Sequence, residues 1–175
     1  MTPIVTGSSL DFISHGAEQT RRIGERLGRL LLPGDVVCLE GDLGSGKTCM
    51  TQGIGRGLGV TLPITSPTFI IVNEYALPEK RKFYHIDLYR VASVAEARAT
   101  GLEEYFYGRD ICAIEWSERV REILPAERLW ITLHDLGGTK RQLRVDVAGA
   151  RYEQLLQDFR QQTFGTRSRL TLREC

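Results

Sequence analysis

The apolar residues of this chain recur with two different spacings. Over residues 17–32 they share one face of a helix, which Pro33-Gly34 ends. Residues 36–39, by contrast, form a continuous apolar run of strand length, which is typical of a strand buried on both faces of a parallel sheet. A glycine-rich loop follows directly, and residues 47–58 again have helical spacing up to Gly59. The pattern predicts a helix, a buried strand, a tight loop and a second helix, in that order.

The rest of the pattern predicts further strands alternating with helices. We expect a loop over 61–68, strands over 69–75 and 83–88, a helix over 94–106, a strand over 111–116, a hairpin of 129–134 with 141–147, and a last helix over 150–162. This order predicts an α/β fold, a three-layer sandwich around a mostly parallel sheet with an antiparallel hairpin at one edge. No internal repeat or linker interrupts it, so we expect one domain over residues 1–164 and a flexible tail over 165–175.

Composition narrows the class of protein. The 175 residues are enough for one domain with a core, and 42% hydrophobic with 26% charged residues is typical of a globular chain. A net charge of +1 gives no reason to expect direct, non-specific binding to nucleic acid. The four cysteines lack C-x-x-C spacing, which favours a reduced, cytoplasmic setting. No signal core and no apolar stretch of 18 residues is visible, so we expect no membrane association.

The glycine-rich loop matches G-x-x-x-x-G-K-[ST] at every fixed position. It consists of Gly41, Asp42, Leu43, Gly44, Ser45, Gly46, Lys47 and Thr48. Its glycines let backbone N–H groups turn toward an anion, and the following helix adds the partial positive charge of its N-terminus. The chemistry predicts that Lys47 reaches the β- and γ-phosphates of ATP and that the Thr48 hydroxyl binds Mg²⁺. We therefore expect a P-loop NTPase-like sandwich, although the loop alone does not say what the nucleotide is used for.

Two acidic residues stand where such a site needs them. Glu115 ends the apolar run 111–114, as the acid of a Walker B strand does, and is our first candidate for binding the metal; the alternative is a surface acid at a strand end. Asp87 shares one face of a predicted strand with His85 and Tyr89. A polar face with a central carboxylate suits orienting a water toward the γ-phosphate, and the alternative is a half-exposed edge strand.

The loop after the P-loop helix contains two more candidates. Ser66 and Thr68 lie where the switch segments of P-loop NTPases sense the γ-phosphate. Hydroxyl side chains beside proline also cap turns, and the spacing does not separate the two roles.

Five segments of the chain resemble one known family. They are the P-loop, Ser66-Pro67-Thr68-Phe69, His85-Ile86-Asp87-Leu88-Tyr89-Arg90, Gly101-Leu102-Glu103-Glu104 and Ile114-Glu115-Trp116. They occur in the order and spacing of the bacterial TsaE (YjeE) family, and the resemblance runs from about residue 17 to residue 147. The P-loop is generic, whereas H-x-D-x-Y-R followed by E-W is specific. One departure is Cys49, which stands where the family commonly has threonine.

The resemblance implies a function in tRNA modification. Members of the family are small cytoplasmic P-loop proteins with weak ATPase activity. They act with two partners, TsaB and TsaD, which form the transferase that installs the threonylcarbamoyl group on adenosine 37 of tRNAs reading ANN codons. Contact with tRNA is then indirect, through the complex, and ATP hydrolysis resets the complex between turnovers.

The resemblance also assigns roles to individual residues. Thr48 and Glu115 would bind Mg²⁺, and Thr68 would lie in the switch-like loop. The catalytic residues would be Asp87, Lys47 and Glu115. Arg141, in the late hairpin, falls where family members place an arginine near the nucleotide. Two other functions use the same loop: a small-molecule kinase of the nucleoside type, and a non-catalytic, nucleotide-gated interaction protein. Against the kinase, the sequence shows no arginine-rich lid segment.

Overall fold

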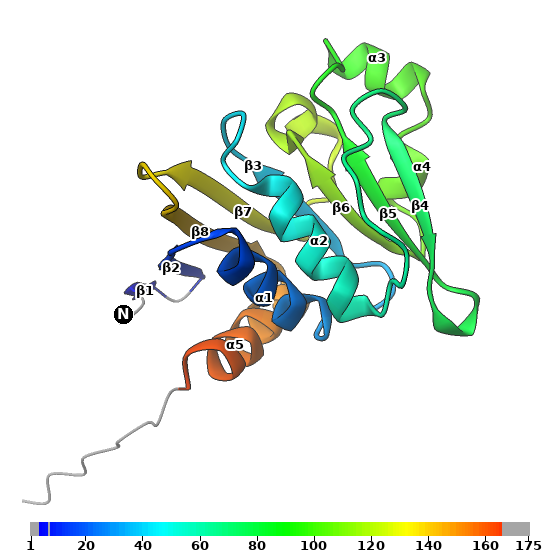
Figure 1. The fold of residues 1–175 in the computed structure, drawn as a ribbon. Helices are drawn as coiled ribbons and strands as arrows, with labels where there is room; N and C mark the ends of the chain where they lie inside the picture. The colour runs from blue at the N-terminus through cyan, green and yellow to red at the C-terminus, as the bar shows by residue number, and fades with distance from the viewer. Residues whose placement is uncertain (1–3, 7, 166–175) are drawn as a thin grey trace, which may run out of the picture.

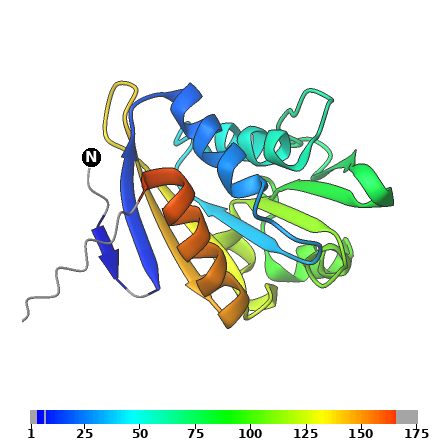
Figure 2. The same ribbon diagram turned by 90° about the horizontal axis from the view of Figure 1, so that it is seen from below.

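One sheet runs through the middle of the molecule and carries helices on both faces (Figures 1 and 2). The computed structural model describes residues 4–6 and 8–165. The strands of the described residues are β1 (Ile4–Thr6), β2 (Ser9–Ser14), β3 (Val36–Glu40), β4 (Val72–Ala76), β5 (Lys82–Asp87), β6 (Ile111–Glu115), β7 (Arg128–Asp135) and β8 (Arg141–Ala148). The α-helices are α1 (Ala17–Gly28), α2 (Lys47–Leu58), α3 (Val94–Ala99), α4 (Glu103–Phe106) and α5 (Ala150–Phe164), with 3-10 turns η1 (Pro78–Lys80) and η2 (Ser117–Ile123).

The centre of the sheet is parallel and its edges are antiparallel. The strand order within the described residues is β1-β2-β8-β7-β3-β6-β5-β4. Strands β7, β3, β6 and β5 pair in parallel, while β4 at one edge and β8, β2 and β1 toward the other are antiparallel. The predicted α/β sandwich is confirmed, with antiparallel strands at both edges rather than the single hairpin expected.

Strand β3 is apolar from Val36 to Leu39 because both faces of the sheet are covered there. Val37 and Leu39 point into a core formed with α1, α2 and α5. Val36 and Cys38 point into a second core formed with α3, α4 and η2. A strand with two buried faces needs no polar alternation, which explains the continuous run in the sequence.

Helices α1 and α2 lie so close that their backbones touch. The facing positions are glycines, Gly24 and Gly28 on α1 and Gly53 and Gly57 on α2. A Cβ atom at Gly53 would stand 2.1 Å from the carbonyl oxygen of Arg21, a distance that real Cβ atoms do not reach. The contact fixes α2, and therefore the loop that precedes it, against the body of the molecule (Figure 1).

Several elements end where a backbone turn requires it rather than where the apolar pattern does. Helix α1 stops at Gly28, short of residue 32. The helix expected over 94–106 is two short helices, because Gly101 adopts a left-handed φ of 71° between them. Residues 69–71 form a turn instead of the start of a strand: Ile71 has a φ of 68° and its N–H donates to the carbonyl of Pro67.

Other predictions were close, and two strands were missed. Helix α2 spans the predicted residues, α5 extends two residues beyond the predicted end, and the hairpin of β7 with β8 is confirmed. Strands β1 and β2 were not predicted. The expected tail falls, except for Gly165, on residues 166–175, which lie outside the described residues. Among the helices of the described ranges, none is long and apolar enough to cross a membrane.

The glycine contact between α1 and α2 leads to a stability prediction. We expect Gly53→Ala to lower the free energy of unfolding by about 2 kcal/mol, because the new methyl group meets a backbone carbonyl that moves only with the whole helix. Gly16→Ala is the matched control, since a Cβ there has nothing within 4 Å. Urea unfolding followed by circular dichroism measures both. Equal stability of the two variants would show that the helices separate at little cost.

Candidate functional site

Parallel pairing brings three chain segments together at the carboxyl ends of the central strands. Residues Asp87 of β5 and Glu115 of β6 are directly paired, and Leu39 of β3 pairs with Glu115 on the other side. The P-loop begins two residues after Leu39. The carboxyl ends of these strands therefore converge on the loop and the two acids, the place where open α/β sheets bind ligands.

A cavity of about 400 Å³ lies at these strand ends. Its walls come from the P-loop and α2, from the loop after α2, and from the ends of β5 and β6. The lining residues are Leu43, Gly44, Gly46, Lys47, Thr48, Cys49, Ser66, Thr68, Asp87, Tyr89, Glu115 and Trp116. The structure thus gathers Lys47, Thr48, Thr68, Asp87 and Glu115 with Leu43, Gly44 and Gly46 of the loop, all of them proposed from the sequence.

The P-loop has the backbone shape that its glycines permit. Gly41 has a φ of 144°, and a Cβ atom there would lie 2.3 Å from the carbonyl oxygen of Leu133. Gly46 has a φ of 105° and immediately precedes α2, which begins at Lys47 without a side-chain cap. The first N–H groups of a helix have no partner within the helix, so this uncapped end presents donors toward the cavity.

Lys47 is buried at the mouth of the loop. Its Nζ atom donates to the carbonyls of Gly41 at 2.5 Å and Asp42 at 2.8 Å, and lies 3.8 Å from the centre of the Trp116 ring. Burial lowers the pKa of the Lys47 ammonium, and the charge of Glu115 opposes that shift. The side chain is held where an anion in the loop would meet it.

Glu115 is a buried acid with three side-chain donors. It is 2% exposed, so the alternative of a surface acid is wrong. Its Oε2 accepts from the Thr48 hydroxyl at 3.0 Å. Its Oε1 accepts from the Thr51 hydroxyl at 3.3 Å and lies 2.7 Å from His85 Nε2. The two residues expected to bind the metal, Thr48 and Glu115, are therefore in direct contact.

The donor set fits Mg²⁺ bound together with a nucleotide. No group of three or more His, Cys, Asp or Glu side chains that could hold a metal occurs in the described part of the chain. Mg²⁺ in nucleotide sites needs no such group, because it takes one or two protein oxygens and completes its shell with phosphates and water. The hydroxyl of Thr48 and the carboxylate of Glu115 are oxygen ligands of that kind.

Asp87 collects donors from the loop that follows α2. Its Oδ2 accepts from the hydroxyls of Ser66 at 2.6 Å and Thr68 at 2.8 Å, and its Oδ1 accepts from the N–H of Tyr89 at 2.9 Å. Strand β5 lies between β4 and β6, so the alternative of an edge strand is wrong. The two hydroxyl oxygens lie 2.6 Å from each other and both lie within hydrogen-bond distance of the acid, a contact that capping their own turn does not require.

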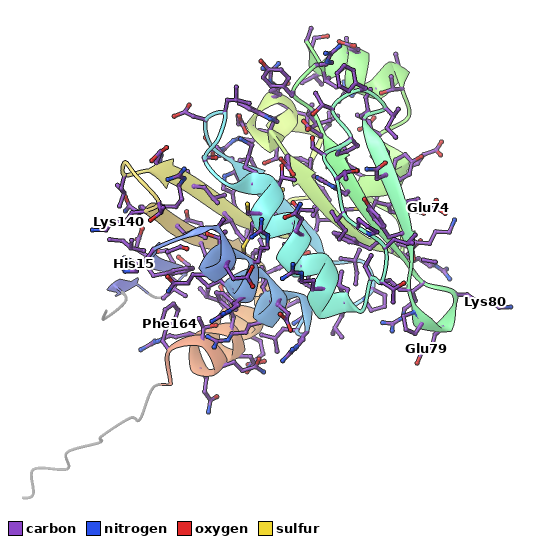
Figure 3. The ribbon with its side chains drawn as sticks, in the orientation of Figure 1. His15, Glu74, Glu79, Lys80, Lys140 and Phe164 are labelled. Atoms are coloured by element: carbon purple, nitrogen blue, oxygen red, sulfur yellow. The ribbon has the colours of Figure 1, made fainter. Side chains whose placement is uncertain are left out.

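Arg141 lies on the far side of the P-loop. Its guanidinium donates to the carbonyl of Gly44 at 3.3 Å and to Asp135 at 2.9 Å. A second cavity of about 200 Å³ opens here between the P-loop, the start of α1 and the β7–β8 turn. In that turn Thr139 donates to the carbonyl of His15 at 2.8 Å, and Figure 3 shows His15 and Lys140 on this side of the molecule.

Sequence reasoning missed several residues of the site. Thr51 was not considered, although its spacing of three from Thr48 on a helix places both hydroxyls on one side. Trp116 and Tyr89 were not proposed as site residues, yet both line the cavity. Nothing in the sequence indicated that the side chain of His85 meets that of Glu115, since the contact joins neighbouring strands.

Comparison with known proteins identifies the family. The family model described as "Threonylcarbamoyl adenosine biosynthesis protein TsaE" matches residues 14–143. The tRNA threonylcarbamoyladenosine biosynthesis protein TsaE of Bacillus subtilis is 42% identical over 144 residues, covering 81% of this chain and 87% of that protein. The protein of the same name from Treponema pallidum is 41% identical over 133 residues, covering 76% of this chain and 97% of that protein.

A solved structure agrees with these sequence matches. The crystal structure of YdiB from Bacillus subtilis superimposes with a TM-score of 0.75 at 34% identity, covering 93% of this chain and 98% of that one. Proteins of the matched family take part in tRNA threonylcarbamoyladenosine biosynthesis. Sequence and structure agree, and the chain belongs to the TsaE family.

Proposed function

We propose that this chain binds ATP with Mg²⁺ and hydrolyses it in the cytoplasm, as the energy-using subunit of tRNA threonylcarbamoylation at adenosine 37. In this proposal it acts with the TsaB–TsaD transferase, and it meets tRNAs reading ANN codons only through that complex. The observation that carries the proposal is the meeting of a P-loop, the Thr48–Glu115 pair and Asp87 around one cavity.

The P-loop and its neighbours supply charge for the phosphates. Backbone N–H groups of the loop and of the start of α2 would surround the β-phosphate, and Lys47 would leave the carbonyls of Gly41 and Asp42 to meet the β- and γ-phosphates. Thr48 and Glu115 would hold the Mg²⁺, which neutralises charge on the transferring phosphoryl group when bound. Arg141, through its contact with Gly44, would keep the loop in shape beside the nucleotide.

Asp87 is the residue assigned to the hydrolytic step. Hydrogen bonds from Ser66, Thr68 and the Tyr89 N–H fix its carboxylate at the cavity wall. In that position it would orient a water and accept its proton while the water oxygen bonds to the γ-phosphorus and the bond to ADP breaks. Thr68, hydrogen-bonded to the same carboxylate, would register whether the γ-phosphate is present.

We propose that the smaller cavity, of about 200 Å³, binds the nucleoside end of ATP. It is lined by Gly44 and Gly46 of the P-loop and by Cys49 of α2, and Arg141 forms part of its wall. Gly44, Gly46 and Cys49 also line the larger cavity, so the two cavities meet at the P-loop and the start of α2. The two adjoining cavities accordingly suit the two ends of one ligand.

Exposed apolar side chains around the larger cavity support a role with partner proteins. Leu43, which is 79% exposed, and Tyr89 line the cavity, and the 82% exposed Phe69 and the exposed Ile70 directly follow Thr68 of its wall. Apolar side chains gathered in water beside a site are typical of a protein interface. If the TsaB–TsaD pair completes the site, the chain should hydrolyse ATP slowly alone and faster with the pair.

Phosphate release tests the proposal directly. We expect slow release by the wild type alone, faster release when the TsaB–TsaD pair of the same organism is added, and a fall of about 100-fold or more for Lys47→Ala, Asp87→Ala and Glu115→Ala. Glu74→Ala is the matched control, because this acid is exposed on the edge strand β4, away from the cavity (Figure 3). It should release phosphate as the wild type does.

Each departure from that outcome has a definite meaning. No stimulation by a TsaB–TsaD pair that is itself competent would contradict the proposed partnership. Equal release by the wild type and the three site variants would contradict the site. Phosphate found on an added nucleoside rather than in solution would identify a kinase, and ATP binding with equally negligible turnover before and after Asp87→Ala would identify a nucleotide-gated interaction protein.

Cysteine labelling offers a second test, which needs no turnover. Cys49 is half-buried and lines both cavities, whereas Cys38 and Cys112 are buried and their burial raises each thiol pKa to about 12. The thiolate is the reactive form, so in a Cys175→Ser background we expect iodoacetamide to modify Cys49 first. A non-hydrolysable ATP analogue with Mg²⁺, at ten times its Kd, should slow that reaction about tenfold. Unchanged labelling, read by mass spectrometry, would place the nucleotide elsewhere.

A further inference from the structure

A buried histidine lies behind the cavity and does not line it. His85 is fully buried in β5, where it pairs with Asn73 of β4 on one side and Ala113 of β6 on the other. Its Nε2 atom is 2.7 Å from Oε1 of Glu115. The ring therefore touches the proposed Mg²⁺ ligand from the interior of the protein, on the side away from the nucleotide.

The direction of this hydrogen bond follows from the chemistry of its partner. A carboxylate has only acceptor atoms, so the hydrogen belongs to His85 Nε2. The other ring nitrogen, Nδ1, has no hydrogen-bond partner within the described residues. A buried polar ring is costly unless its hydrogen bonds repay the loss of water. Here the only hydrogen bond of the ring within the described residues is the one to Oε1 of Glu115.

The two oxygens of Glu115 have different surroundings. Oε1 receives His85 from β5 and Thr51 from α2. Oε2 receives Thr48, the other proposed metal ligand. Thr51 shares its one hydroxyl hydrogen with the carbonyl of Lys47 at 3.2 Å, so the short contact with His85 is the main anchor of Oε1. The other oxygen is left turned toward Thr48 and the cavity. A glutamate side chain has three rotatable bonds, and a short hydrogen bond to one of its oxygens favours one orientation among many.

We propose that His85 is a positioning residue, which holds Glu115 so that Oε2 is presented to the Mg²⁺ of Mg–ATP. Outer hydrogen-bond partners of metal ligands set ligand orientation and typically contribute 10- to 100-fold to metal affinity. The proposal rests on the metal site of the proposed function. It differs from a role in filling the core, because a core residue affects stability without changing the dependence on Mg²⁺.

The test compares variants by binding rather than by turnover. His85→Gln keeps an N–H donor near the position of Nε2, whereas His85→Asn is polar but too short to reach Glu115, and His85→Leu has no donor. His134→Leu removes an exposed histidine of β7 and is the matched control. Calorimetry would measure binding of a non-hydrolysable ATP analogue to the full chain over a Mg²⁺ titration, and again in EDTA.

We expect the variants to separate in their dependence on Mg²⁺. His85→Asn and His85→Leu should raise the Mg²⁺ concentration at half-maximal binding about tenfold, while His85→Gln should stay within about threefold of the wild type. Binding in EDTA should be the same for all, which also shows that each variant is folded. In a Glu115→Gln background, His85→Asn should add no further shift, because its effect passes through Glu115.

Three results would overturn the proposal. One is that His85→Asn reaches half-maximal binding at the same Mg²⁺ concentration as the wild type, while its binding in EDTA is intact. Another is that His85→Asn raises this Mg²⁺ concentration about tenfold in the Glu115→Gln background as well. The last is wild-type binding that does not depend on Mg²⁺, which would overturn the proposed metal site and this inference together, whereas the first two leave that site standing.

Discussion

The parallel pairing of β3, β6 and β5 is the constraint on which the site depends. In a parallel sheet the register of two strands decides which side chains end level with one another, and here Asp87, Glu115 and Leu39 are level. The chain leaves β3 directly into the P-loop, so the loop and both acids meet without any long-range adjustment. Helices on both faces bury these strands, and burial strengthens every hydrogen bond at their ends. The close contact of α1 with α2 then holds the helix that carries Lys47, Thr48 and Thr51.

Burial also explains why the polar residues of the site come as a network. A carboxylate that is 2% exposed, as in Glu115, needs donors for its lone pairs, and Thr48, Thr51 and His85 provide them. An ammonium with most of its water removed needs acceptors, and for Lys47 these are the carbonyls of the P-loop. Apart from Nδ1 of His85, these groups satisfy one another, so removing any one takes a hydrogen bond from a buried partner. The same hydrogen bonds that shape the site for a nucleotide therefore also lower the free-energy cost of burying its charged groups.

The sequence predicted local features well and through-space contacts poorly. Helix α2 could be placed to the residue because the P-loop fixes its start and Gly59 its end. Strand β2 was missed although Leu10 and Phe12 alternate with less buried residues, because the alternation is only a few residues long. The turn at Ile71 was missed because its left-handed backbone is rare for a β-branched residue and has no local signal. The contacts of Glu115 with His85 and Thr51 depend on strand order and helix placement, which residue spacing does not determine.

The two acids of the site are held by different kinds of structure, which agrees with the different roles proposed for them. Glu115 receives its donors from β5 and α2, elements whose backbones are fixed by the sheet and by the contact of α2 with α1. Asp87 receives two of its three donors from Ser66 and Thr68, in a loop without regular structure. That loop continues into Phe69, an exposed side chain stacked under Arg90 beside the cavity. An acid with rigid donors is suited to binding a metal in one geometry. An acid whose donors lie on a loop is suited to a step that changes as nucleotide or partner reaches that loop.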